Sequence, residues 1–309
     1  MGAAAVLWSG LLLTCVCAAP AAAAPTSLRT GAGAPPGAIV LAIDSAKPLQ
    51  LSWKNAAATL QARGAEQAAY ELEVHLLSPR GTDKLLWSSG AVKSAAQQVT
   101  LPQQAKLAPD ADYRWRVKAT VGIAAAAWSA PLNFSTSPSA ASWEKASWIG
   151  GRQQLRSDFT IPASREPVRA RMHISGVGAF HAELNGRKVG DHVLDPPQSV
   201  YPYGILYSSF DVLAMLRPGH NAVGAMLGNY KWGYLDTWCD MTTAGGPDGC
   251  RALIVQLSVM LDDGTELLHT TNADDGQWQC RQGPVHTRPR LCRSSSLQRA
   301  LLTSSGSSR

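Results

Sequence analysis

The stretch Leu107-Ala-Pro-Asp-Ala-Asp-Tyr-Arg-Trp-Arg-Val117 places alternating apolar and polar side chains directly after a Pro and two Asp residues. Such alternation is typical of a β-strand with one face against a core, and Pro and Asp favour turns. The residues around it repeat this pattern in short runs with almost no helical periodicity. We predict strands at residues 38–43, 49–54, 69–77, 84–87, 98–101, 113–120 and 132–135. Short strands at this density predict a β-sandwich.

Three features of this region resemble the fibronectin type III domain. They are Trp53 in the second predicted strand, the Leu107-Ala-Pro109 run, and the Tyr113–Val117 strand that follows it. The resemblance covers about residues 36–137. It implies that Trp53 fills the centre between two sheets and that the Tyr113 hydroxyl bonds the chain near the Leu-Ala-Pro run, as a tyrosine corner. Such domains serve as spacers, adhesion modules and enzyme appendages, so this resemblance predicts a fold and no activity.

A second all-β region follows the small-residue linker at 135–142. Asn185-Gly186 and Asp262-Asp-Gly264 predict tight hairpin turns. Residues 211–217 predict one short helical turn with Asp211 as its cap. The predicted strands are residues 155–161, 168–175, 179–184, 188–193, 205–210, 221–227, 252–261 and 266–271.

The most informative stretch is Ala182-Glu-Leu-Asn-Gly-Arg-Lys-Val-Gly-Asp-His-Val-Leu-Asp-Pro196, together with Trp148-Ile-Gly150 upstream and Leu216-Arg-Pro-Gly-His-Asn221 downstream. In this order, after a fibronectin-like domain, these motifs resemble the N-terminal region of bacterial-type α-L-rhamnosidases. The resemblance implies a galactose-binding-like jelly-roll sandwich over residues 143–285. It also implies that the chain is the non-catalytic N-terminal part of a secreted glycoside hydrolase.

The family resemblance points to carbohydrate recognition. Sugar rings stack their C–H faces on aromatic side chains, and their hydroxyls need polar partners that donate and accept hydrogen bonds. The sequence departs from the family's Pro-Gly-x-Thr-x-Tyr pattern, since it reads Pro196-Pro-Gln-Ser-Val-Tyr201. The candidate sugar-binding residues are Asn185, Asp191, Tyr201, Tyr203, Asn229, Tyr230, Trp232, Asp236 and Trp238.

Each candidate also has a structural interpretation. Asn185 belongs to a predicted turn, and the Asp191 carboxylate is suited to accept hydrogen bonds from backbone donors, so a structural role is favoured for both. The aromatic residues of the segment 229–238 are more numerous than a surface loop needs for its own packing. Contact with sugar and docking onto another domain of a full-length enzyme both explain them.

The N-terminus and the cysteines indicate secretion. Residues 1–24 contain an apolar run and end in an Ala-x-Ala pattern before Pro25, which predicts a signal peptide. Its removal leaves Cys239, Cys250, Cys280 and Cys292 in an oxidising compartment. We predict a disulfide between Cys239 and Cys250, which flank a loop rich in Gly and Thr. A zinc site is the alternative, but the paired short spacing of zinc ligands is missing, so no metal is predicted.

The sequence carries none of the common catalytic motifs, including the nucleophile elbow, the His-Glu-x-x-His helix, the P-loop and the dinucleotide fingerprint. The α-L-rhamnosidase family keeps its catalytic carboxylates in a downstream α/α barrel, so we expect no activity from this chain alone and no cofactor. Residues 286–309 are acid-free and rich in Arg and Ser, which predicts a disordered tail or a shifted reading frame.

The formal charge of +6 is concentrated in that tail, so we predict no nucleic-acid partner. No membrane contact is expected after cleavage of the signal peptide. The expected partners are rhamnose-containing or other plant and microbial glycans, and the enzyme's own catalytic domain. The alternative function is that of a free-standing secreted lectin-like or adhesion protein.

Overall fold

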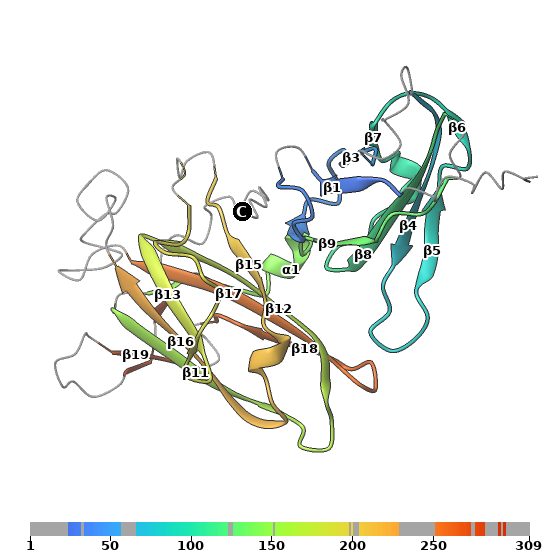
Figure 1. The fold of residues 1–309 in the computed structure, drawn as a ribbon. Helices are drawn as coiled ribbons and strands as arrows, with labels where there is room; N and C mark the ends of the chain where they lie inside the picture. The colour runs from blue at the N-terminus through green and yellow to red at the C-terminus, as the bar shows by residue number, and fades with distance from the viewer. Residues whose placement is uncertain are drawn as a thin grey trace, which may run out of the picture.

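The computed structural model describes residues 24–31, 34–56, 66–122, 126–150, 152–197, 199, 204–228, 251–272, 276–281, 290–291 and 293–294. These residues form two β-sandwiches, with the short helix α1 (Ala140–Trp143) between them (Figure 1). The all-β prediction is therefore confirmed. In the part of the chain that the structure describes, no helix is long and apolar enough to cross a membrane.

The first sandwich packs two sheets against each other. One has the strand order β1-β3-β7, and the other has the order β2-β9-β8-β4-β5, with β6 also paired to β4. The strands are β1 (Thr26–Thr30), β2 (Val40–Ile43), β3 (Gln50–Lys54), β4 (Gln67–Leu76), β5 (Lys84–Ser88), β6 (Val92–Lys93), β7 (Gln98–Thr100), β8 (Asp112–Val121) and β9 (Leu132–Thr136), and a 3-10 turn η2 (Gln103–Ala105) precedes β8.

The core of the first sandwich confirms what the fibronectin-like features imply. Trp53 is buried between the sheets. The Tyr113 hydroxyl accepts a hydrogen bond of 2.7 Å from the backbone N–H of Ala108, inside the Leu-Ala-Pro run, so the tyrosine corner is present. The structure adds the strand β1, which was not predicted. It pairs with β3, and the indole N–H of Trp115 donates to Thr30 Oγ1 at 2.8 Å.

The second sandwich is the predicted jelly roll. Its sheets run β15-β12-β17-β10-β21, with β18 paired to β17, and β14-β13-β16-β11-β19-β20. The strands are β10 (Ile149–Gly150), β11 (Gln154–Ile161), β12 (Pro167–Val177), β13 (Ala179–Leu184), β14 (Arg187–Lys188), β15 (Ser208–Asp211), β16 (Gly219–Gly228), β17 (Ala252–Leu261), β18 (Glu266–Thr270), β19 (Trp278–Arg281), β20 (Arg290–Leu291) and β21 (Arg293–Ser294), with a 3-10 turn η3 (Leu213–Met215). The strands β20 and β21 lie in the stretch where the composition predicts a tail.

The local turns follow the sequence closely. Asn185 and Gly186 have φ angles of 54° and 75°, as a two-residue hairpin turn between β13 and β14 requires. Asp211 accepts a hydrogen bond of 3.1 Å from the backbone N–H of Leu213, at the start of the helical turn η3.

One predicted strand ends early. The alternation at 188–193 predicts a strand, but the structure leaves the sheet after Lys188. Gly190 has a φ of +68°, which turns the chain away from the extended conformation. A Cβ atom at this position would lie 2.2 Å from the Phe210 ring, so the ring packs against a glycine that no larger residue could replace. The residues after Lys188 form a loop.

Polar and aromatic contacts join the two sandwiches, in a region that we call the interdomain seam. Arg169 on β12 pairs with Asp110, just before β8, and with Asp112, the first residue of β8, and Arg171 on β12 also pairs with Asp112; the N···O distances are 2.8 to 3.0 Å. Both guanidinium groups are nearly buried. The apolar part of the seam contains Ala42, Trp143, Trp148, Val177, Ile205, Tyr207, Ala252 and Ile254. The seam therefore gives the two domains a shared core.

Candidate functional site

A pocket of about 310 Å³ lies in the second sandwich, where β13, the end of β16 and the loop after β14 meet. We call it the rim pocket. It is lined by residues 179–182, Lys188, Val189, residues 192–195 and residues 226–228. Its volume is at the small end of the range of ligand pockets in proteins.

Internal bonds hold the loop that forms one side of the rim pocket. The Lys188 ammonium donates to the backbone carbonyl of His192 at 2.7 Å. The His192 ring lies 2.9 Å from the carboxylate of Asp195, and the Asp195 carbonyl accepts from the backbone N–H of Phe180 at 2.7 Å. These contacts tie the loop to β13 and leave the imidazole of His192 partly exposed.

The edge of the rim pocket is apolar and open to solvent. Val193, Leu194 and Met226 are 80%, 61% and 53% exposed. They lie beside the polar groups of Lys188 and His192, which also line the pocket. Exposed apolar side chains next to hydrogen-bonding groups are typical of a surface that binds a ligand or another protein.

The structure separates the two described candidates for sugar binding. Asn185 is engaged within the fold, since its amide nitrogen donates to Met215 O and Asn221 Oδ1, both at 2.8 Å, and its amide oxygen accepts from the backbone N–H of Ala222 at 2.9 Å. It holds the hairpin turn against η3 and β16. Asp191 is exposed and precedes His192 in the loop that lines the rim pocket. Of these two, Asp191 is the one available to a ligand.

The remaining sequence candidates lie outside the described residues. They are Tyr201, Tyr203, Asn229, Tyr230, Trp232, Asp236 and Trp238, and the predicted disulfide cysteines Cys239 and Cys250. In the chain, the segment 229–250 directly follows Gly228, which lines the rim pocket. Cys280 is disulfide-bonded, and its partner cysteine lies outside the described residues.

Lys188, His192 and Asp195 were not predicted from the sequence to be parts of one site. The available signal was Val193-Leu194, two apolar residues between His192 and Asp195 at the end of the predicted strand 188–193. Among the residues that the structure describes, no cluster of three or more His, Cys, Asp or Glu side chains could hold a metal ion.

Two family models match the chain. Residues 39–139 match the model described as "Rha78A-like, N-terminal immunoglobulin domain", and residues 165–290 match "Alpha-L-rhamnosidase N-terminal domain". Among curated proteins, alpha-L-rhamnosidases from Formosa agariphila and Alteromonas sp. are 28% and 27% identical over 79% and 84% of this chain. The chain spans only 28% and 29% of the length of these relatives.

Solved structures share the arrangement of both sandwiches. The alpha-L-rhamnosidase from Dictyoglumus thermophilum matches with a TM-score of 0.68 at 24% identity, over 86% of this chain and 30% of that one. The Streptomyces avermitilis alpha-L-rhamnosidase, solved with L-rhamnose, matches with a TM-score of 0.63 at 18% identity, over 85% of this chain and 41% of that one. At these identities the likeness shows the fold.

Proposed function

We propose that this chain recognises rhamnose-containing glycans at the rim pocket. Residues 39–139 and 165–290 belong to the immunoglobulin and N-terminal domains of the alpha-L-rhamnosidase family. These two domains form the non-catalytic N-terminal region of that family. The observation that carries the proposal is the combination of exposed apolar side chains with the polar side chains of Lys188 and His192 around one small cavity. The similarity of the two domains to α-L-rhamnosidases supplies the class of sugar.

The chemistry of the rim pocket suits a deoxy sugar. Rhamnose carries a methyl group and apolar C–H faces, which Leu194 and Met226 would cover. Its hydroxyls need partners that donate and accept, and the ammonium of Lys188, the imidazole of His192 and the carboxylate of Asp191 provide both. Each of these residues lines the pocket or lies next to a lining residue.

Calorimetric titration of the chain with L-rhamnose and with D-galactose tests the proposal. We expect a dissociation constant of about 1 mM for rhamnose, which corresponds to about 4 kcal/mol of binding free energy, and weaker binding of galactose. Asp191→Ala should weaken rhamnose binding about tenfold, because an exposed carboxylate is removed without a change in the fold. The matched control is Glu266→Ala, an exposed carboxylate on β18. Equal affinity in both variants would rule out the rim pocket.

A second candidate function is docking of the rest of a longer enzyme onto the same rim. The exposed Val193, Leu194 and Met226 favour it, since apolar side chains at the centre of an interface contribute most of its affinity. Leu194→Glu should then abolish association with a separately expressed α-L-rhamnosidase catalytic region, whereas Asp191→Ala should have little effect. The reverse pattern, with rhamnose binding lost in Asp191→Ala, favours the sugar site.

We also propose that the protein is secreted. Thr26, the first residue of β1, pairs with Lys54, and Leu28 is part of the first core, so cleavage after Ala24 would leave the fold intact. A disulfide at Cys280 fits an oxidising compartment. N-terminal sequencing of the exported protein should give Pro25 as the first residue. A mature protein that starts at Met1, or beyond Leu28, would contradict the proposal.

A further inference from the structure

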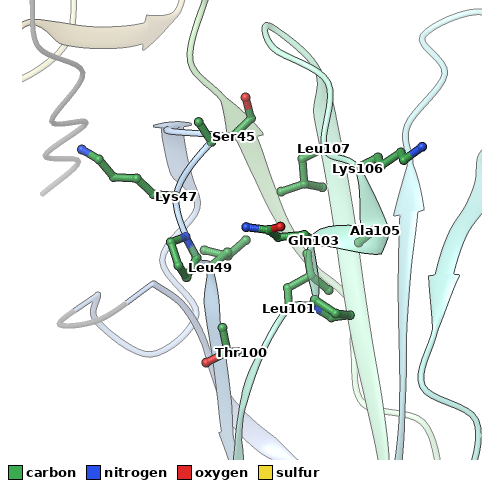
Figure 2. Close-up of a pocket in the computed structure, with 12 residues that line it drawn as sticks. Ser45, Lys47, Leu49, Thr100, Leu101, Gln103, Ala105, Lys106 and Leu107 are labelled. Carbon is green, nitrogen blue, oxygen red and sulfur yellow. The ribbon is translucent and has the colours of Figure 1, made fainter.

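A pocket of about 400 Å³ lies in the first sandwich, between η2 and the loop that connects β2 to β3. The ammonium groups of Lys47 and Lys106 point away from it on opposite sides (Figure 2), and Lys47 already pairs with Asp44 at 3.3 Å. These polar ends do not converge on one ligand. A more specific chemical pattern lies on β9 of the same sandwich, in Asn133-Phe-Ser135.

The pattern on β9 is that of an N-glycan acceptor. Asn133-Phe-Ser135 reads Asn-x-Ser with a residue other than Pro in the middle, which marks an asparagine that accepts an N-linked glycan. The chain neighbours of Asn133, Leu132 and Phe134, are buried in the first core. Strand alternation turns Asn133 itself to the exposed outer face of the sheet. A glycan attached there would extend into solvent and leave the core unchanged.

The fold itself gives the Asn133 side chain no task. Its amide makes no hydrogen bond to another residue of the described part of the chain. The cross-strand neighbour on β8 is Arg114, which pairs with Asp83 at 2.8 Å. On the other side, in the register that pairs β2 with β9, lies Ile39, which is 60% exposed. Asn is depleted in β-strands because its side chain competes for backbone hydrogen bonds, so an unbonded Asn on a strand indicates a role outside the fold.

The hydroxyl of Ser135 determines when a glycan can be added. Ser135 is 1% exposed, and its Oγ accepts a hydrogen bond of 3.1 Å from the backbone N–H of Ala42 on β2. The strand β9 lies between β2 and β8, so it is paired on both sides. Since the pattern requires a hydroxyl two residues after the asparagine, the modifying enzyme must reach Ser135 as well as Asn133. The folded sandwich prevents this, so the modification has to precede folding.

We propose that Asn133 is an N-glycosylation site, modified during export before the first sandwich folds. The donor is a lipid-linked oligosaccharide pyrophosphate, and the enzyme is an oligosaccharyltransferase of the export membrane. A bond forms between Asn133 Nδ2 and C1 of the first sugar, and the bond from C1 to the pyrophosphate oxygen breaks. The amide nitrogen gives up one proton, and the lipid pyrophosphate leaves with the electron pair of the broken bond. This inference rests on the proposed secretion, because the donor lies in the export compartment, and it does not depend on the rim pocket.

The test is cell-free translation of the full chain with endoplasmic-reticulum microsomes, followed by endoglycosidase digestion and mass spectrometry. We expect one glycan per chain, located on Asn133. Asn133→Gln and Ser135→Ala should each remove it completely, whereas Ser135→Thr, which keeps a hydroxyl, should retain it. Asn55→Gln makes the same change at an asparagine of the same sandwich outside the pattern, and this control should keep the glycan. A glycan that persists in Asn133→Gln would overturn the proposal.

The same reaction separates this inference from the proposed secretion, because cleavage after Ala24 lowers the mass of the chain. A chain that is cleaved but carries no glycan refutes the modification and leaves secretion standing. A second version, in which an established signal peptide replaces residues 1–24, enters the microsomes in any case. A glycan in this version alone would refute secretion and leave Asn133 as an acceptor, and its absence from both versions would overturn the proposal.

The timing has its own measurement. The chain is first folded without microsomes and then incubated with solubilised microsomes and the lipid-linked donor. It should stay unmodified, because the hydroxyl of Ser135 is buried against Ala42. Modification of the folded chain to the same extent as during translation would refute the requirement that glycosylation precedes folding.

Discussion

The interdomain seam and the rim pocket both place a histidine beside an aspartate and a basic side chain, but in different surroundings. In the seam, His173 lies against Asp110 and two arginines in the shared core of both sandwiches. In the rim pocket, His192 pairs with Asp195 beside Lys188 and exposed apolar side chains. The Arg169 and Asp195 side chains are both nearly buried, at 9% and 10% exposed, but the His192 ring that pairs with Asp195 is 31% exposed. The exposure of the basic partner therefore separates a group of charges that is closed off from water from one that keeps contact with solvent.

The physical basis of this difference is desolvation. A charge taken out of water costs several kcal/mol unless it is paired, so each partner in a buried cluster depends strongly on the others. A pair that keeps contact with water costs little to break. The same substitution in the two regions should therefore give very different losses of stability.

The largest expected effect is that of Asp112→Asn in the seam. Its carboxylate accepts from Arg169 Nε at 2.9 Å and from Arg171 Nη2 at 3.0 Å. With the neutral amide, Arg169 would keep only Asp110 and Arg171 would keep only Asp211 as carboxylate partners, and Asp211 is exposed. Because both guanidinium groups are nearly buried, we expect a loss of about 3 kcal/mol in the free energy of unfolding. Urea unfolding measures it.

The control for Asp112→Asn is Asp158→Asn, whose partner Arg156 is exposed, and which should cost less than about 1 kcal/mol. Equal losses of stability in the two variants would mean that the ion pairs of the seam stabilise the fold no more than a surface ion pair does. The proposed difference between buried and exposed charges would then be wrong.

The second effect is the pH dependence of stability from His173. Burial lowers the pKa of His173 to about 4, against an ordinary value of 6.5. Between these pH values the unfolded chain takes up a proton that the folded chain does not, so stability is lost as the pH falls from 6.5 towards 4. The loss is about 1.4 kcal/mol per pH unit, or about 2 kcal/mol at pH 5.

Urea unfolding at pH 7 and pH 5 measures this loss. The variant His173→Gln should lack this part of the pH dependence, whatever its stability at pH 7. The pH slope of its stability is the informative quantity, because the charged groups that face position 173 are the same in both proteins, namely Asp110, Asp112, Arg169 and Arg171. Identical pH slopes in the variant and the wild type would show that His173 ionises in the folded state.

The third effect is that of Asp195→Asn in the rim, the same chemical change as in the seam. The variant loses the charge-assisted bond to His192, at 2.9 Å, while the imidazole keeps its contact with solvent. We expect a loss of about 1 kcal/mol in the free energy of unfolding, by urea titration under the conditions used for Asp112→Asn. A loss as large as in the seam would show that the rim loop is part of the structural core.

The sequence predicts local structure well where one or two residues determine it. The hydroxyl of Tyr113 bonds the chain five residues away at Ala108, and Asn185-Gly186 supplies two positive φ angles by itself. The strand at 188–193 was wrong because alternation alone does not show where the Phe210 ring packs against Gly190.

The seam could not be predicted from the sequence. Arg169 and Asp112 are 57 positions apart, and their pairing requires that both sandwiches have folded and met. The rim pocket was also not predicted, because its parts come from β13, β16 and a loop, and neither described candidate is among its lining residues. Long-range packing creates both regions, and neither leaves a periodic signal in the sequence.

The smallest effect has the opposite sign and concerns Leu194. This residue holds a φ of +63°, which costs a residue with a side chain about 1 kcal/mol, yet it is exposed and contributes little to the core. Leu194→Gly removes the strain but makes the unfolded chain more flexible, so we expect a net gain of about 0.5 kcal/mol in the free energy of unfolding.

The same variant should bind L-rhamnose several-fold more weakly, since the apolar cover of the rim pocket is lost. Val193→Gly is the control: Val193 lies beside it and is also exposed, but its φ is not positive, so the glycine there should lower stability. A gain in stability together with weaker binding would mean that strain at the rim is kept for recognition. Unchanged binding of L-rhamnose would mean that Leu194 does not contribute to recognition. The proposed difference between a rim that binds ligand and a seam that stabilises the fold would then be contradicted.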